Sequence, residues 1–489
     1  MKYRRFIVVT GIMCVFMVQG CDWLELLPPD GLVVDEYWQT KEDVEAVLMG
    51  AYQKFADMDE NLFFYGELRG EMLKPAVWAP ENQKQIMESN IYPTNPMCDW
   101  SGFYKIINYC NNVITLAPGV LEVDKTFTEF QLKNFQAEAL FLRSLAYFYL
   151  VRIFGDVPYV ASPTSDDNVD FYLPKSRGDS ILMVVTSDLL AFEPTIATDY
   201  PNFKEDRGRA TKGAVNALLA DIALWRFDYE ECLTYIEKIE AMNKYFLMTS
   251  AKWFEIFLPG NSLESIFELQ FDGIGQNNTM YDVTFQWDLY SSSEVAIEMM
   301  DPLTENEIKE AVRGKGTLAI ESQDYRIFKY IGGAPDQKTY RSGADARACN
   351  FIIYRLADIL LMKAEALSQL DRFAEAEIVL NQIRTRALVQ TLDLSDSRIA
   401  YEDAIMEERA RELAFEGKRY FDLMRMGRRN NFERKNDLIE VIIQQAPSTQ
   451  KLVLASKLSN PLGWFLPILD VELEKNAKLV QNPYYDNEY

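Results

Sequence analysis

The chain has 489 residues, of which 48% are hydrophobic and 25% are charged, the balance of a folded globular protein. It carries 74 acidic and 50 basic residues, and the net charge of -24 repels phosphate backbones, so we expect no nucleic-acid binding. Histidine is absent. Its absence excludes Ser-His-Asp and Cys-His catalysis, histidine-containing zinc motifs and haem held by a proximal histidine.

The N-terminus has the pattern of a lipoprotein signal. Basic residues precede an apolar run over 6–18, which is shorter than the roughly 20 residues that a membrane-spanning helix needs. Gly20 stands directly before Cys21, as in a lipoprotein cleavage box. We expect removal of residues 1–20 and acylation of Cys21, whose acyl chains would anchor the protein stably in a membrane. The alternative is a plain signal peptide followed by an incidental cysteine.

Four further cysteines lie beyond this signal, namely Cys98, Cys110, Cys232 and Cys349. They form no CxxC spacing, so we expect neither a metal nor a redox site at these residues, and no cofactor. Buried free thiols are the simplest interpretation, and a Cys98–Cys110 disulfide is the alternative in an oxidising compartment. The Asp and Asn residues of 265–290 leave calcium binding open, because they show no ligand spacing.

Most of the remaining chain has helical periodicity. Helices are predicted over 43–55, 103–116 and 129–154, and the last of these ends at Gly155. One long helix is expected over 401–427. Charged residues interrupt the apolar surface of the helix over 129–154, and we expect them to form buried ion pairs.

Two stretches, 212–239 and 355–387, have the form of tetratricopeptide-type helix pairs. Small residues line the first helix of each, and a short turn with an aromatic residue leads to the second. The two copies lie too far apart for a continuous repeat array, so long insertions must interrupt it. We place these insertions at about 56–101, 156–177 and 259–350, and a further degenerate pair within 43–155. Insertions of a helical solenoid map to one face, which is often the binding face.

Several motifs occur in order between residues 21 and 485. They include AEALFLRSLAYF at 137–148, FGDVP at 154–158, GRATK at 208–212 and RLADILLMKAEA at 355–366. Together they resemble the SusD/RagB family of outer-membrane nutrient-binding lipoproteins. Ser144 and Leu469 depart from residues usual in the family, and both departures are mild. The resemblance implies an all-α, SusD-like fold of tetratricopeptide-type helix pairs, with residues 21–489 as one domain.

The resemblance also implies a location, a partner and a ligand. Family members sit on the outside of a Gram-negative outer membrane, cap a SusC-like TonB-dependent transporter and bind oligosaccharide, or in some members peptide. A non-glycan ligand at the same location is therefore one alternative. An all-helical glycoside hydrolase with two carboxylates is another, because it does not need histidine. A repeat scaffold that binds proteins alone is the third.

The motif carboxylates and arginines are interpreted as helix-packing ion pairs and not as a catalytic pair: Glu138, Arg143, Asp358, Glu365, Glu408, Arg409, Glu412, Glu416 and Arg419. Ligand binding is instead expected in the insertions, where flat aromatic rings can stack on sugars and polar groups can bond hydroxyls. The candidates are Trp78, Asn82, Trp100, Tyr281, Trp287, Tyr290, Tyr340 and Arg341. For each of these residues alone, core packing is the competing interpretation.

Overall fold

The computed structural model describes residues 37–164, 170, 172–300, 313, 318–319, 325–336, 338–395 and 397–486. Within these residues the fold is mostly helical, with three short two-stranded sheets, which confirms the predicted all-α class. No helix in this part of the chain combines the length and apolar character that crossing a bilayer requires. The expected signal peptide and Cys21 lie outside the described residues.

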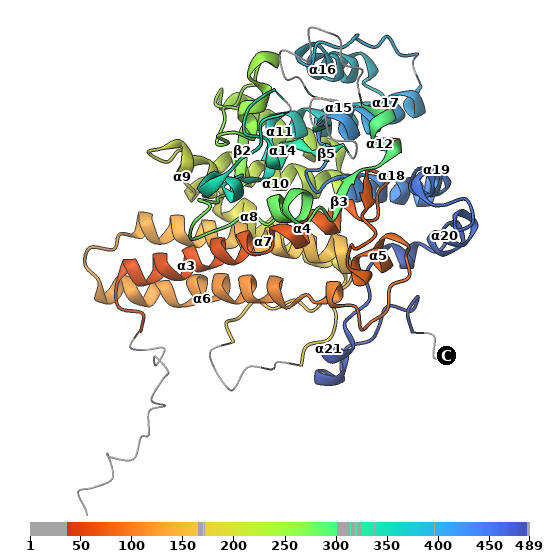
Figure 1. The fold of residues 1–489 in the computed structure, drawn as a ribbon. Coiled ribbons are helices and arrows are strands. Elements are labelled where there is room, and N and C mark those ends of the chain that lie inside the picture. The colour runs from red at the N-terminus through yellow and green to blue at the C-terminus, as the bar shows by residue number, and fades with distance from the viewer. Residues whose placement is uncertain are drawn as a thin grey trace, which may run out of the picture.

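Three long helices form one layer of the body: α3 (Lys41–Ala56), α6 (Ser101–Val123) and α7 (Glu129–Phe154), which lie side by side (Figure 1). The bounds of α7 match the prediction. Thr128 and Gln131 form a capping box at its start, and Gly155 ends it with a φ of 76°. Nearly all of its side chains from Ala137 to Phe154 are buried, as expected for a helix that is apolar on every side.

The two predicted helix pairs are confirmed. The first consists of α10 (Lys212–Trp225) and α11 (Tyr229–Ala241), and the second of α15 (Leu356–Gln369) and α16 (Phe373–Arg386). Helix α11 packs on α15, so the two pairs are neighbours in space despite the long insertion between them. Helix α8 (Gly178–Phe192) packs against α7 and α10 and joins this array to the first layer.

The prediction of one helix over 401–427 is wrong, because the structure has two: α17 (Arg398–Glu412) and α18 (Arg419–Phe432). Phe415 and Gly417 between them adopt positive φ values of 63° and 70°. The backbone amides of Gly417 and Lys418 donate to Glu67 Oε1 at 2.9 and 3.2 Å. Hydrogen bonds from a distant segment therefore replace the helical bonds at this break.

Glu67 itself gives a testable consequence of this packing. Burial raises the pKa of its carboxyl from 4.5 to about 8, although the two amides oppose the shift. The folded state therefore holds this proton more tightly than the unfolded state, and Glu67's contribution to stability is lost as pH rises from about 4.5 to about 8. We expect Glu67→Gln to gain stability relative to the unmodified chain across this interval, as measured by urea unfolding at several pH values.

Glu231→Gln, at an exposed position of α11, is the matched control for that experiment. As a change at an exposed position, it should alter the unfolding free energy by no more than about 0.5 kcal/mol. If the difference in unfolding free energy between Glu67→Gln and the unmodified chain does not change with pH, the assignment of a buried proton to Glu67 is contradicted.

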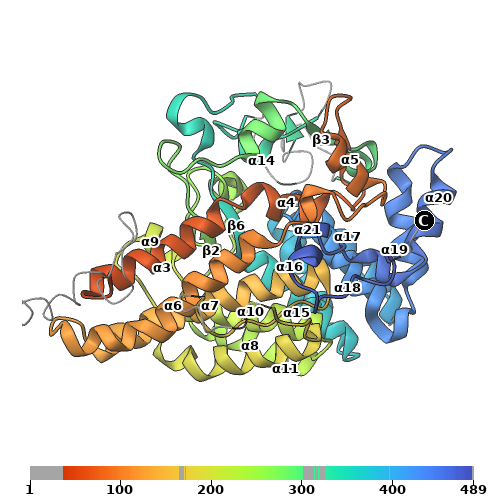
Figure 2. The same ribbon diagram turned by 90° about the horizontal axis from the view of Figure 1, so that it is seen from below.

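The first and third insertions contain more regular structure than expected, and they are joined to each other. Strand β1 (Leu73–Pro75) pairs antiparallel with β3 (Tyr290–Ser292), so that Pro75 lies opposite Tyr290. Strand β2 (Ser265–Leu269) pairs with β6 (Phe351–Arg355), and β4 (Leu318–Ala319) pairs with β5 (Arg326–Ile327). In Figure 2, β3 and α14 lie on the opposite side of the molecule from α8 and α11.

The remaining helices are short. They are α4 (Asp59–Glu67), α5 (Glu81–Met87), α9 (Phe203–Gly208), α12 (Glu294–Met299), α14 (Phe328–Ile331), α19 (Lys435–Ile442), α20 (Lys451–Leu458) and α21 (Asp470–Lys475). Helices α4, α5, α12 and α14 belong to the insertions, which therefore contain short helices as well as loops.

Candidate ligand-binding site

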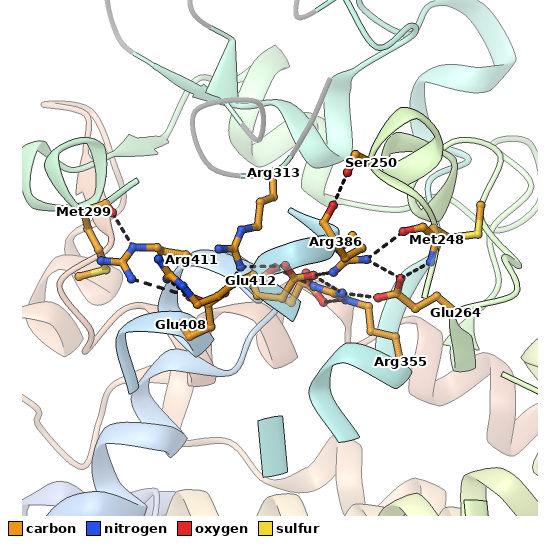
Figure 3. Close-up of polar contacts among 12 residues, drawn as sticks. Met248, Ser250, Glu264, Met299, Arg313, Arg355, Arg386, Glu408, Arg411 and Glu412 are labelled. Carbon is orange, nitrogen blue, oxygen red and sulfur yellow. Dashed lines mark hydrogen bonds and ion pairs between the residues drawn. The ribbon is translucent and has the colours of Figure 1, made fainter. Parts of the chain in front are cut away.

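The charged residues of the family-like motifs form a buried ion network between the helices (Figure 3). Arg355 is at its centre and is fully buried. Its Nη1 lies 2.6 Å from Glu264 Oε1 and 2.8 Å from Glu412 Oε1, and its Nε lies 2.8 Å from Glu416 Oε2. Arg386 also pairs with Glu264 and Glu412. The network thus connects β6, α16 and α17 with the third insertion.

The other motif residues are engaged in the same way. Asp358 lies 2.9 Å from both Arg409 and Lys418, and Arg425 bonds Glu365. Burial alone would raise the pKa of Asp358, but the two cations outweigh burial and hold it below its ordinary value. The remaining motif pairs are Glu138 with Arg209, Arg143 with Asp188, Arg419 with Glu71, and Glu408 with Arg313 and Arg384. Apart from the half-exposed Asp188, these carboxylates are buried and paired, which fits their interpretation as packing contacts.

Two of the predicted site residues, Trp78 and Trp287, come together at the surface. Trp78 is 64% exposed and Trp287 is 52% exposed. The indole Nε1 of Trp78 donates to the backbone oxygen of Trp287 at 3.0 Å, although the two residues are 209 positions apart. The amide of Ala76 bonds Leu289 O at 2.8 Å and extends the β1–β3 pairing toward them. We call this pair the tryptophan platform.

A group of aromatic and charged side chains on the same insertion lies on both sides of Trp287 in the sequence. Asp288 lies 3.4 Å from Arg326, and the guanidinium of Arg326 lies 4.8 Å from the centroid of the Phe285 ring. Phe285 contacts Tyr340 with centroids 4.8 Å apart and Tyr281 with centroids 5.2 Å apart. Sequence reasoning selected the two tyrosines but missed Phe285 and Arg326. The spacing of Phe285 two residues before Trp287 was the signal available for it.

A cavity of about 430 Å³ lies near the platform, between α5 and α20. Pro75 and Met87 line one side, and Pro447 and Leu454 line the other. Lys84, at the edge of this cavity, donates from Nζ to the backbone oxygen of Val77 at 2.6 Å. This cavity has apolar walls and a polar edge, as ligand sites usually have, but neither Trp78 nor Trp287 is among its lining residues.

The other predicted site residues are buried or half-buried and do not belong to the tryptophan platform. Trp100, Tyr290 and Arg341 are buried at 3%, 1% and 4% exposure, so the structure favours core packing for them. Trp100 packs edge-on against Phe154, the hydroxyl of Tyr290 bonds Gln83, and Arg341 donates to Gly332 and Phe257. Tyr281 is also buried, at 8% exposure, with its hydroxyl on Arg341 O. Asn82 on α5 and Tyr340 are half-buried.

The cysteines follow the simplest interpretation. Cys98, Cys110, Cys232 and Cys349 are free and buried, so the alternative Cys98–Cys110 disulfide is not formed. Burial raises the pKa of the Cys98 and Cys110 thiols to about 12, which makes thiolate chemistry at neutral pH unfavourable. Among the residues that the structure describes, no group of three or more acidic or cysteine side chains is placed to hold a metal ion.

Comparison with known proteins identifies the family. The model of the SusD family matches residues 321–485, and the model described as starch-binding, associating with outer membrane, matches residues 22–224. The SusD-like protein P38 of Formosa agariphila is 24% identical over 99% of this chain and 100% of its own length. A SusD-like protein of Bacteroides ovatus is 23% identical over 87% of this chain and 82% of its own length.

Solved structures agree in fold. A SusD superfamily protein from Bacteroides vulgatus covers 92% of this chain and all of its own, with a TM-score of 0.75 and 17% identity. The surface glycan-binding protein A from Bacteroides thetaiotaomicron, solved with laminarihexaose, covers 91% of this chain and all of its own, with a TM-score of 0.67 and 21% identity. By its motifs, its two model matches and its fold, the chain belongs to the SusD/RagB family.

Proposed function

We propose that this protein is a cell-surface nutrient-binding lipoprotein that captures an oligosaccharide on the tryptophan platform. It delivers this ligand to a SusC-like TonB-dependent transporter, and acyl chains on Cys21 anchor it to the outer membrane facing the cell exterior. The description of the model that matches residues 22–224 supports the location, and the relative solved with laminarihexaose supports the class of ligand.

The observation that carries this proposal is the exposure of two adjacent tryptophans. Large aromatic side chains that gather at the surface of a folded protein mark an interaction site. The hydrogen bond from Trp78 to the Trp287 backbone holds one indole in place, so little conformational entropy is lost when a sugar ring stacks on it. Tyr340, Arg326 and Asp288 lie next in the same insertion and supply polar groups for hydroxyls.

The same structure gives little support to a glycoside hydrolase. Such an enzyme needs two carboxyl groups that reach the scissile bond, usually with one kept protonated as the acid. The carboxylates of the helical motifs are buried in ion pairs, and cations hold the pKa values of Asp358 and Glu412 low against the effect of burial. Asp59 has a pKa raised by burial to about 6, but its carboxylate is buried and accepts from Thr279 N. We therefore propose binding without catalysis.

Glycan binding and its dependence on the platform test this proposal. We expect calorimetric titration of the chain lacking residues 1–21 to detect a neutral oligosaccharide from a broad panel, with affinity of about μM to mM. Each ring that stacks contributes about 1 kcal/mol, so the double variant Trp78→Ala/Trp287→Ala should lose about 30-fold in affinity. Phe130→Ala is the control, because Phe130 is an aromatic residue of α7 that is 72% exposed.

Three outcomes would contradict the proposal. Equal affinity in the double variant would remove the platform from the site. Retention of short peptides together with no response to any glycan would favour the peptide alternative. Release of reducing sugar that one Asp or Glu substitution abolishes would identify an enzyme.

A further inference from the structure

A second cavity, of about 300 Å³, lies where the end of α7, the start of α8, the end of α10 and α18 meet. Figure 2 shows α7, α8 and α10 on the side of the body away from β3 and α14. Phe154, Trp225 and Phe465 contribute aromatic side chains to the lining, and none of its lining residues belongs to the tryptophan platform. Its charged residues are Lys175, Arg177, Arg428, Asp156 and Asp179, so basic side chains exceed acidic ones.

Arg428 differs from its neighbours on α18. Arg425 and Arg429 both reach Glu365, at 2.7 and 3.8 Å. Within the described parts of the chain, no carboxylate or other acceptor bonds the side chain of Arg428, and its Nη1 is buried without a partner. A buried charged donor that lacks an acceptor is costly, so this arrangement calls for an acceptor that the chain itself does not supply.

Aromatic rings hold the Arg428 side chain in place. Its guanidinium carbon lies 4.4 Å from the centroid of Trp225 and 5.6 Å from that of Phe227. Cation–π contacts of this kind use the flat face of the guanidinium and leave its N–H edge available for bidentate bonds to an oxyanion. Burial lowers the pKa of Arg428, which an arginine tolerates without losing its charge.

Lys175 is the second basic group of this cavity. It is half-buried, and burial lowers its pKa against the attraction of Asp156. One carboxylate oxygen of Asp156 already has a hydrogen-bond partner, because its Oδ1 accepts from the Gly178 amide at 2.9 Å. Asp179 favours the charge of Arg428 from a distance but is itself exposed and forms no ion pair with it in the described structure.

We propose that this cavity binds the carboxylate or sulfate group of a small acidic ligand, with Arg428 and Lys175 as the donors. The aromatic walls would take the carbon skeleton of that ligand. The volume is at the lower limit of small-molecule sites, so the ligand has few non-hydrogen atoms beyond the anionic group. This site is independent of the tryptophan platform and of the neutral glycan proposed to bind there.

Ligand-dependent thermal stability tests the proposal, because a ligand of the folded state raises the midpoint of unfolding with concentration. The probes are glucuronate and sulfate, with glucose and chloride at matched ionic strength as controls. We expect at least one of the two oxyanions to raise the midpoint beyond the effect of chloride, and glucose to have no effect. A carboxylate ligand is indicated by a response to glucuronate alone, and a sulfate ligand by a response to sulfate alone.

The apparent affinity for the oxyanion should fall at least tenfold in Arg428→Gln. It should not change in Arg372→Gln, which removes an exposed arginine of another surface. Lys175→Gln, in the loop before α8, serves the same purpose if Arg428→Gln does not fold. The absence of any response beyond that of chloride would overturn the proposal. So would an equal response in the Arg428 and Lys175 variants and the unmodified chain.

Discussion

We expect Arg355→Met to destabilise the protein by about 3–5 kcal/mol, the usual result of removing one partner from a buried ion pair. Arg355 is fully buried and bonds Glu264, Glu412 and Glu416 at once. Methionine fills much of the same volume, so the loss would come mainly from carboxylates left without their cation. Urea unfolding followed by circular dichroism measures the change.

The control for this prediction is Arg372→Met, which removes an exposed arginine paired with Glu375 one turn away on α16. Surface pairs of this kind contribute little, so its stability should stay close to that of the unmodified chain. The double variant Arg355→Met/Glu264→Gln tests the mechanism, because it removes one of the carboxylates left unpaired. It should be more stable than the sum of the two single changes predicts. Additivity of the two changes would contradict an origin in unpaired charge.

Local sequence determined the helices of the body well, because their end signals lie within a few residues of each end. The start and end of α7 follow from Thr128, Gln131 and Gly155, all of which a reader of the sequence can see. The break between α17 and α18 does not follow in the same way. Its hydrogen bonds come from Glu67, some 350 positions away, so helical periodicity through 401–427 gave no indication of it.

The candidate site shows the same limit. Sequence composition selected both Trp78 and Trp287, but their contact depends on the register of β1 with β3 across 209 positions. The sequence also did not show which of Trp287 and Tyr290 would be exposed. These two residues lie in one short segment, and their side chains are 52% and 1% exposed. Asp288 between them has a φ of 51°, and this left-handed turn redirects the chain between the exposed ring and the buried one.

Charge gave a clearer signal than aromaticity. A carboxylate or arginine within an apolar helix must be paired if it is buried. The motif residues therefore predicted a buried ion network of the kind that forms around Arg355. The residues that the insertions contribute to this network, such as Glu264 and Arg313, could not be predicted from the sequence. Both belong to the third insertion, which lies far from the motif helices in the sequence.

The contact between α4 and the α17–α18 turn gives the second large effect. A Cβ atom built on Gly66 would lie 1.9 Å from the backbone oxygen of Gly417, a distance that no side-chain rearrangement can relieve. Glu67 hydrogen-bonds the amides of Gly417 and Lys418 at this contact, so the two backbones cannot separate without losing those bonds. We expect Gly66→Ala to cost about 3 kcal/mol or more in unfolding free energy, at the upper end of overpacking effects.

Gly50→Ala is the matched substitution, and we expect it to change the free energy of unfolding in the opposite direction. Gly50 lies within α3, and a Cβ atom there would meet nothing within 4 Å. Alanine is the better helix former, so this variant should gain about 0.5–1 kcal/mol. Both variants can be compared by the same urea titration, in which equal slopes show that the midpoint alone has moved. A stable Gly66→Ala chain would mean that α4 and the turn lie farther apart than the structure places them, and the raised pKa of Glu67 would then disappear with the contact that buries it.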